Sequence, residues 1–504
     1  MADDPEKDGA EGEGRSESTL SRRAVLKTGI GVAGVLVGCG DDGGSDPDGG
    51  TMPGADMSGT DGGPMPGTDG GPPEMDGGPD EPDMRPLPDG GMDDVRSLPA
   101  TGAFMLGVAS GDATEDSVVL WTRYDGSGSV TLVVWELLAD GADGARVLDM
   151  AVTPDDAGFV HETIAVSAGQ RYGYAFVEDG TARSTIGRFR AAIASDAMEP
   201  LVFGAVSCTS NGRSFDTLLR AGEREDLDAF LLLGDTTYND GSETIEEFRG
   251  KWEENFATEG YIAARAATSM LATWDDHEID NNWDPENTAV GIVDAGRQAF
   301  FEHLPLERLA VDPGRVWRQR RWGRTLEVFV LDCRSEREPS TRNDADATYV
   351  SAEQLDWLKT GLSSSTAVFK VILNSVGITD FPFLLDLGSA DRWEGYAAQR
   401  EDILSFIDDA GISGVFWIAG DFHFASLGRV GASGELGENQ WEVLVGPGGQ
   451  TQNPLHTTLT GSRWPHADGT NNYTELRFDP TTAEIRVRFI DGSGDVIADE
   501  TISP

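Results

Sequence analysis

The chain is poor in basic side chains: 38 Lys and Arg stand against 88 Asp and Glu among 504 residues, a formal charge of -50. This charge argues against binding to a nucleic-acid backbone and gives no support for electrostatic docking to anionic lipid. We therefore do not expect a bulk polyanion as substrate or nucleic acid as a partner. The acidity favours solubility in a secreted protein, with a specific role in cation binding as the alternative. The length allows more than one domain with a full core, and we expect a monomer.

The N-terminal region has no apolar run long enough for a permanent membrane helix, because the stretch from Thr28 to Gly38 is too short to span a bilayer. This stretch follows a twin-arginine pattern at Ser21 to Lys27 and ends in Leu36-Val37-Gly38-Cys39, which resembles a bacterial lipobox. Residues 1–39 therefore predict a twin-arginine export signal whose cleavage leaves Cys39 to be diacylated. The mature protein would be extracytoplasmic, in the periplasm or at the cell surface, and lipid-anchored to the membrane. An ordinary export signal with an incidental cysteine is the alternative.

The segment that follows lacks core-forming residues. From Gly40 to about Leu98 the composition is dominated by Gly, Asp, Pro and Met, with repeats such as Asp61-Gly62-Gly63-Pro64. Such a composition cannot bury a core, which predicts a disordered linker over residues 40–98. The glycine-rich nonapeptide pattern of calcium-binding modules is absent, so we interpret the segment as a spacer.

Ordered structure is expected from about Thr101. Short segments rich in β-branched and aromatic residues are separated by Gly/Asp turns, which is typical of strands. They predict a small all-β sandwich of the immunoglobulin or fibronectin kind over residues 99–196. Its one histidine, His161, is expected at a surface or edge. The predicted strands are Ser117 to Arg123, Val130 to Leu137 and Arg171 to Val177.

After Pro200 apolar strands alternate with amphipathic helical stretches, which predicts an α/β layered domain over residues 197–504. The chain ends in an apparent β-hairpin from Glu475 to Ile502. The predicted strands are Leu201 to Ser207, Ala229 to Leu233, Met270 to Trp274, Glu327 to Leu331, Val368 to Leu373 and Val415 to Ala419. The predicted helices lie around Phe215 to Arg224, Ala352 to Gly361 and Tyr396 to Ala410.

Polar residues that can coordinate a metal follow each of these strands. In open α/β sheets ligands bind at the carboxyl ends of the strands, so these side chains are expected to converge on one site. An Asp after a strand is usually a turn former and a lone His is usually a core residue, but the ordered set favours metal ligation. The sequence thus indicates a metallohydrolase. The three richest stretches are Gly234 to Tyr238, Trp274 to Glu278 followed by Asn281-Asn282, and Gly420 to His423.

In this order the motifs resemble those of the PhoD-like (alkaline phosphatase D) family of calcineurin-like metallophosphoesterases. The resemblance extends from about residue 101 to residue 504. It implies an α/β fold: a four-layer αββα metallophosphoesterase sandwich preceded by the small all-β sandwich. The further segments that carry the resemblance are Phe104 to Asp112, Val119 to Arg123, Leu331 to Arg334, Gln354 to Leu358 and Trp393 to Tyr396.

The resemblance implies a ferric iron and one or two calcium ions. Cys208, Tyr238 and His423 would bind the iron, with Asp235 bridging to the second metal. Anionic sulfur and oxygen donors stabilise a highly charged iron that acts as Lewis acid.

The calcium ligands implied by the resemblance are Asp276, Asn281 and Asp421, with Asn374 as a further candidate. Related di-metal phosphoesterases carry Asn and His where this chain has Asp276 and Asp421, and an oxygen-only ligand set favours a hard cation. Spacing does not decide which of Asp275, Asp276, Asn281 and Asn282 touches the metal.

The expected chemistry is attack of a metal-activated hydroxide on phosphorus. Metal binding lowers the pKa of water from ~15.7 towards ~7, so that no separate strong base is needed. Arg334 or Arg337 would clamp the phosphate, because a guanidinium matches two phosphoryl oxygens in a bidentate fork. His277 is predicted to protonate the leaving group.

The three cysteines offer one competing structure. With Cys39 lipidated, Cys208 and Cys333 could form a disulfide, which would remove the thiolate that a metal needs. We favour Cys208 as a ligand, because twin-arginine export would carry a protein folded and metal-loaded beforehand. Cys333 is then a buried neighbour.

Taken together, the sequence predicts a secreted alkaline phosphatase or phosphodiesterase that hydrolyses phosphate esters. A phospholipase-type phosphodiesterase would share every ligand and differ at the rim of the cleft. A non-catalytic lipoprotein that binds metal or phosphate would also keep the ligands, with less reason to retain His277 and the arginines.

Overall fold

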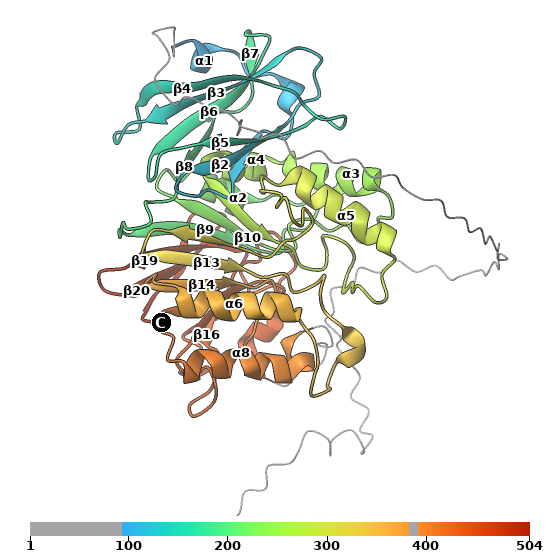
Figure 1. The fold of residues 1–504 in the computed structure, drawn as a ribbon, viewed down its shortest axis with the longest axis vertical. Coiled ribbons are helices and arrows are strands. Elements are labelled where there is room, and N and C mark those ends of the chain that lie inside the picture. Colours follow the sequence, from blue (N-terminus) through green and yellow to red (C-terminus); the bar gives the residue numbers. More distant parts are fainter. Residues whose placement is uncertain (1–92, 383–391) are drawn as a thin grey trace, which may run out of the picture. The chain divides into compact units, whose positions relative to one another are not determined.

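The computed structural model describes residues 93–382 and 392–504, whose fold is drawn in Figure 1. The predicted export signal with Cys39, and the predicted linker up to residue 92, lie outside the described residues. Residues at the end of that linker form the short helix α1 (Asp93–Ser97). Val95 is buried there in one cluster with Trp135 and Val177, so regular structure begins before residue 99.

A five-stranded antiparallel sheet lies in the N-terminal part, with the order β4-β3-β6-β7 and with β8 paired to β6. Most residues of its central strands are buried, and Val134 stands opposite Tyr174 in the register of β3 and β6. This sheet corresponds to one layer of the predicted sandwich. Its strands are β3 (Val130–Leu137), β4 (Asp143–Val152), β6 (Arg171–Glu178), β7 (Ala182–Arg183) and β8 (Gly187–Arg190).

A nine-stranded sheet has the order β21-β20-β19-β9-β10-β11-β1-β2-β5. Strand β1 pairs in parallel with β11, with Ser110 opposite Ser269, so three N-terminal strands continue the central sheet. The predicted all-β sandwich therefore shares a sheet with the α/β part. The strands are β1 (Val108–Gly111), β2 (Ser117–Arg123), β5 (Phe159–Ala165), β9 (Leu201–Val206), β10 (Ala229–Leu233), β11 (Ser269–Thr273), β19 (Asn472–Asp479), β20 (Glu484–Asp491) and β21 (Val496–Ile502).

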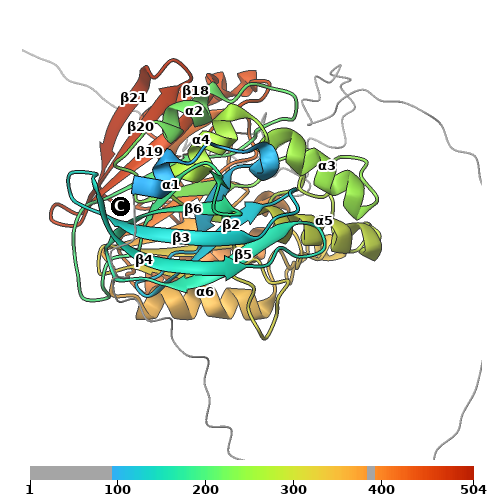
Figure 2. The ribbon, with the colours of Figure 1, turned by 90° about the horizontal axis from the view of Figure 1, so that it is seen from above.

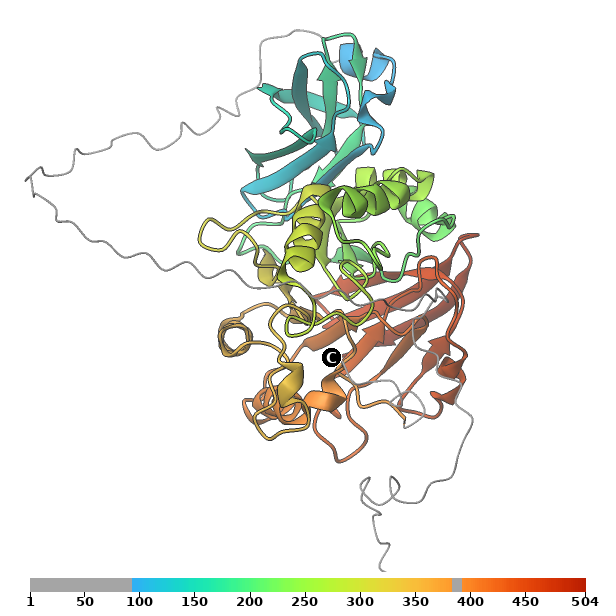
Figure 3. The same cartoon turned by 90° about the vertical axis from the view of Figure 1, so that its right-hand side faces the viewer.

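The C-terminal strands, red in Figure 3, correct one expectation. The predicted hairpin from Glu475 to Ile502 is a three-stranded antiparallel meander, because β19 pairs with both β9 and β20, and β20 pairs with β21. The turn between β20 and β21 is short and polar. The hydrophobic pattern did not separate these two strands, so the sequence predicted two strands where the structure has three.

A seven-stranded sheet has the order β12-β13-β14-β15-β17-β16-β18. Strands β13, β14 and β15 run parallel, with Val328 opposite Val371 and Val371 opposite Phe416. The strands are β12 (Arg318–Trp322), β13 (Leu326–Val330), β14 (Phe369–Leu373), β15 (Val415–Ala419), β16 (Ala425–Arg429), β17 (Trp441–Leu444) and β18 (His466–Asp468).

Helices lie on the outer faces of the two large sheets, with α6 and α2 on opposite sides in Figure 2. Among the described residues no helix has the length and apolar character needed to cross a bilayer. The α-helices are α2 (Asp216–Gly222), α3 (Ile245–Phe256), α4 (Glu259–Ala267), α5 (Val290–His303), α6 (Ala352–Ser364) and α8 (Ala397–Asp409). The 3-10 helices are η2 (Gly102–Phe104), η3 (Pro339–Thr341), η4 (Trp393–Tyr396) and η5 (Pro454–Thr458).

Burial explains the uninterrupted apolar strands. In β10, Leu231 packs with Val328 and Val371 of the other sheet, whereas Phe230 packs with residues of the helices, such as Trp252. Both faces of the central strands β10, β11, β13, β14 and β15 are therefore covered, which removes the polar alternation of a half-exposed strand. The result is the predicted αββα layering, and each of the six strands predicted after Pro200 is present.

Candidate metal centre

The turns after three strands adopt an uncommon backbone conformation. Cys208 after β9, Asp235 after β10 and Asp421 with His423 after β15 have φ values of 57°, 52°, 69° and 56°. Non-glycine residues rarely occupy this left-handed region, and such strain gathers at functional sites. Gly234, with φ of 86°, lets the chain pass Asp275, because a Cβ there would lie 2.5 Å from the Asp275 Cβ. The backbone thus places donor groups from separate strands in one small volume.

The first donor group contains Cys208, Asp235 and His423, whose ligand atoms all lie within 4.8 Å of one another. The hydroxyl oxygen of Tyr238 lies 3.2 Å from Asp235 Oδ2 and 3.2 Å from His423 Nε2. The Cys208 sulfur lies 3.5 Å from Asp235 Oδ2. The structure therefore brings together all four residues that the resemblance implies as iron ligands.

The second donor group contains Asp235, Asp276 and His277, again with ligand atoms within 4.8 Å of one another. Asp235 is common to both groups, as a bridging carboxylate would be. Its Oδ1 is buried and has no hydrogen-bond partner among the described residues. A buried carboxylate oxygen of this kind is costly unless a cation is bound, so the donor set fits two metal ions.

The electrostatics of the two groups agree with this interpretation. Burial raises the pKa of Asp235 well above its usual range, and the neighbouring Asp276 adds to the effect. Burial also lowers the pKa of His423 to about 4, with contributions from the charges of His277, Arg392 and Arg213. For Asp276 burial raises the pKa, but the charges of Arg334 and His277 outweigh it and hold the pKa below its usual value. A neutral His423 and an ionised Asp276 are the forms that bind metal, whereas Asp235 has to lose its proton when a metal binds.

His277 has a partner that the sequence interpretation missed. Its Nδ1 lies 2.8 Å from the carboxylate of Asp240, and its ring stacks on Tyr238 with a centroid distance of 4.0 Å. Asp240 also accepts a hydrogen bond from the backbone N–H of Asn281, at 2.7 Å. The signal was present in the sequence, because Asp240 follows Tyr238 by two positions in the same loop.

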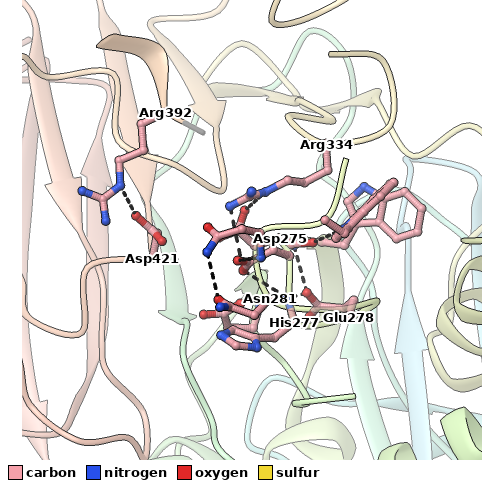
Figure 4. A network of polar contacts seen from close by, with 12 residues as sticks. Asp275, His277, Glu278, Asn281, Arg334, Arg392 and Asp421 are labelled. Atoms are coloured by element: carbon pink, nitrogen blue, oxygen red, sulfur yellow. Dashed lines mark hydrogen bonds and ion pairs between the residues drawn. The ribbon is translucent and has the colours of Figure 1, made fainter. Parts of the chain in front are cut away.

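Glu278 ends the stretch Trp274 to Glu278 that the sequence marked, but no role was predicted for it (Figure 4). Its buried carboxylate accepts hydrogen bonds from the backbone N–H groups of Asp235, Thr236 and Asp275, at 3.1, 2.6 and 2.9 Å. It therefore ties the turn after β10 to the turn after β11. This arrangement holds in place Asp235, the residue common to both donor groups.

The structure gives Arg334 a different role from the phosphate clamp that we predicted. Its side chain is 0% exposed, and its Nε lies 2.6 Å from Asp275 Oδ1. Arg337 is also buried, and its guanidinium donates to the carbonyl of Trp283. Both arginines brace the loops that carry the donors, and neither side chain is exposed for a substrate to reach.

The predicted calcium ligands are only partly gathered. Asp276 belongs to the second donor group, and its Oδ2 accepts a hydrogen bond of 2.7 Å from the backbone N–H of Asn282. The half-buried Asn281 uses its side-chain oxygen to accept from Asn282 Nδ2, at 3.3 Å. Asp421 lies outside both donor groups and is ion-paired to Arg392, with Nε 2.9 Å from Oδ2. Of the neighbouring aspartates, Asp275 is engaged by Arg334, which leaves Asp276 as the better metal ligand.

The two described cysteines are free thiols, and both are buried. The competing Cys208–Cys333 disulfide is therefore absent from this structure. Cys333 donates to the side-chain oxygen of Asn374 at 2.8 Å, and this contact agrees with its expected place as a buried neighbour.

Comparison with known proteins places this architecture among phosphatases. The family model described as PhoD-like phosphatase matches residues 203–483, and that of the PhoD-like phosphatase N-terminal domain matches residues 92–193. Alkaline phosphatase D of Bacillus subtilis (strain 168) is 30% identical over 376 residues, which span 64% of this chain and 64% of that protein. The match thus covers somewhat less than two thirds of the relative.

Two solved structures share the fold. A structure of PhoD superimposes with a TM-score of 0.69 at 22% identity, covering 80% of this chain and 89% of the other. A purple acid phosphatase from yellow lupin (Lupinus luteus) seeds gives a TM-score of 0.57 at 14% identity, covering 79% and 73% of the two chains. These similarities confirm the predicted α/β metallophosphoesterase fold.

Proposed function

The chain belongs to the PhoD-like phosphatase family, and from this premise we propose that it is a metal-dependent phosphoesterase that hydrolyses phosphomonoesters or phosphodiesters. The observation that carries the proposal is Asp235, whose carboxylate is shared by two donor groups at the ends of strands from both large sheets. A shared carboxylate suits two adjacent metal ions that act on one phosphoryl group.

The donor chemistry supports different metals in the two positions. Cys208, Tyr238, His423 and Asp235 would hold ferric iron, because thiolate and phenolate oxygen stabilise a highly charged ion. Asp235 and Asp276, joined by Asn281 and Asp421, would hold calcium through oxygen atoms alone. When bound, the metals would supply Lewis acidity towards the substrate and the attacking water.

His277 is proposed to hold the proton that the leaving group needs. With Nδ1 facing Asp240, a proton on that nitrogen is stabilised by the carboxylate, and Nε2 is the nitrogen that would exchange a proton with substrate. His277 also belongs to the second donor group, so a metal-ligand role is the competing assignment. Metal analysis of His277→Ala separates them: intact metal content with strongly reduced turnover supports proton transfer, and lost metal supports ligation.

Arg392 replaces Arg334 as the proposed phosphate-binding cation. Its side chain is 17% exposed, lies beside Asp421, and stacks on Phe422 with the guanidinium carbon 4.0 Å from the ring centroid. Figure 4 shows Arg392 and Arg334 approaching the donor residues from different loops. A partly exposed guanidinium next to the metal ligands can pair with phosphoryl oxygens, whereas a buried one cannot.

The proposed location is extracytoplasmic, with the protein exported by the twin-arginine route and held by a lipid on Cys39. The support is the sequence pattern of residues 21–39, which precedes the described residues. Cys39→Ala in the full chain should abolish labelling by a radioactive fatty acid and release the protein from membranes; unchanged labelling would reject the anchor.

The activity is tested on purified protein with a phosphomonoester and a phosphodiester chromogenic substrate, alongside elemental analysis. Iron and calcium together with turnover support the proposal. Turnover of the diester alone would narrow it to a phosphodiesterase, and no turnover of either substrate by fully metallated protein would reject it.

A further inference from the structure

The hydroxyl of Ser207 lies directly against the sulfur of Cys208. The distance from Ser207 Oγ to Cys208 Sγ is 2.9 Å, and both residues are buried. Within residues 93–382 and 392–504, the sulfur is the one hydrogen-bond partner that the structure gives this hydroxyl. A buried hydroxyl whose single hydrogen-bond partner is a sulfur can change the electron density of that sulfur.

The surrounding backbone keeps the hydroxyl in place. Gly420 makes the room, because a Cβ at that position would lie 2.1 Å from Ser207 Oγ. The carbonyl of Ser207 accepts a hydrogen bond from the backbone N–H of Gly448, at 2.8 Å. The serine is thus held between the turn after β15 and the loop after β17.

The direction of the hydrogen bond follows from the state of the sulfur. A thiol at Cys208 can donate towards Asp235 Oδ2, 3.5 Å away, and can accept from Ser207. A metal-bound thiolate carries no proton, so the serine O–H must then be the donor.

We propose that Ser207 is a positioning residue that donates a hydrogen bond to the Cys208 thiolate and so weakens electron donation from this sulfur to iron. The inference rests on the proposed function, which places iron at this sulfur. Hydrogen bonds to ligating sulfur withdraw electron density from the metal and raise its reduction potential. They also lower the energy of the sulfur electrons, which moves the thiolate-to-iron charge-transfer band to shorter wavelength.

The test compares Ser207→Ala with Ser207→Thr, which keeps the hydroxyl, in the purified, iron-loaded protein. We expect Ser207→Ala to shift the charge-transfer band to longer wavelength and to lower the reduction potential. Ser207→Thr should stay close to the wild type in both measurements. Gly420→Ala, whose added methyl displaces the hydroxyl, should shift the band in the same direction as Ser207→Ala.

Ser375→Ala is the matched control. Ser375 is also fully buried, follows β14, and has a side-chain oxygen without a hydrogen-bond partner among the described residues. Loss of this hydroxyl should leave the band and the potential unchanged.

The outcomes separate the inference from the function on which it rests. An iron-loaded wild type with a band that neither Ser207→Ala nor Gly420→Ala moves would overturn the inference and leave the proposed iron site standing. A wild type that binds no iron would reject both. Equal shifts of the charge-transfer band in Ser207→Ala and Ser375→Ala would also overturn the inference, since the loss of either buried hydroxyl would then have the same effect.

Discussion

Nδ1 of His277 lies 2.8 Å from both carboxylate oxygens of Asp240. The contact joins the turn after β11 to the loop after β10, and the backbone N–H of Asn281 holds the same carboxylate at 2.7 Å. The carboxylate therefore fixes both the tautomer and the ring orientation of the histidine. This geometry makes Asp240 the member of the proposed proton-transfer pair that can be changed without replacing a residue of either donor group.

Asp240→Asn should lower kcat by roughly 100-fold, at the lower end of the contribution that positioned acid–base groups make. The amide keeps the shape of the side chain but no longer stabilises a charged imidazole. KM and metal content should change little, because Asp240 belongs to neither donor group. Steady-state kinetics with elemental analysis checks this result.

Asp280→Asn is the control for that experiment. Asp280 is exposed in the same region and accepts a hydrogen bond of 3.0 Å from the backbone N–H of Gly241. Its replacement should leave kcat within about twofold, as surface substitutions usually do. A comparable loss in both variants would mean that the loop, and not the histidine partner, determines the rate.

The sequence predicted the donor residues because two simple patterns coincide at them. Uninterrupted apolar runs mark strands that are covered on both faces, and the residue after each run lies at the carboxyl end of a sheet. Cys208, Asp235 and His423 follow three such runs and do meet in the structure. Local sequence was sufficient there, because only the position of each strand end had to be correct.

Features that depend on contacts between distant segments were not predictable in this way. The partner of Arg334 is Asp275, 59 positions away, and nothing local distinguishes a guanidinium that braces a loop from one that faces a substrate. The pairing of β1 with β11 joins residues 110 and 269, so that three strands of the expected N-terminal domain continue the central sheet.

Arg334→Met should strongly reduce the free energy of unfolding and should leave substrate binding unchanged. The change leaves the Asp275 carboxylate buried beside Asp276 without its nearest cation, and breaking such a pair costs about 3–5 kcal/mol. Thermal denaturation should show a large fall in Tm, whereas KM of the protein that remains folded should be close to the wild type. An unchanged Tm with a raised KM would instead restore the phosphate-binding role that the sequence suggested.

Stability at acid pH should depend on Asp112, which contacts Arg318 at 2.5 Å and Arg320 at 3.1 Å. Burial raises the pKa of Asp112, but the two arginines and a hydrogen bond from the backbone of Glu307 outweigh it and lower the pKa. A lowered pKa in the folded state means that the stabilisation is complete above the unfolded pKa of about 3.9 and is lost as the pH falls through the folded value.

The Tm of the wild type should therefore decrease when the pH is lowered below about 4. Asp112→Asn should have a lower Tm than the wild type at neutral pH, and its Tm should change less as the pH is lowered further. Glu353→Gln is the control, because Glu353 is 79% exposed and 3.8 Å from its arginine partner. If the Tm decreases equally with falling pH in the wild type and in Asp112→Asn, other carboxylates control unfolding at acid pH.

Arg392→Ala should affect substrate and calcium in opposite directions, because the guanidinium is paired to a predicted calcium ligand. The Nε–Oδ2 distance to Asp421 is 2.9 Å, so the arginine and a calcium ion compete for one carboxylate. Removing the arginine should raise KM for a phosphate ester about 10-fold, equivalent to ~1.4 kcal/mol. It should also tighten calcium binding several-fold, since the competing charge is gone, while iron content stays constant.

Kinetics at saturating calcium and a calcium titration measure the two effects separately. Arg429→Ala, an arginine stacked on Trp441 outside the donor groups, should change neither. If Arg392→Ala weakens calcium binding, the arginine supports the metal site and does not compete with it, and the phosphate-binding assignment would have to rest on KM alone.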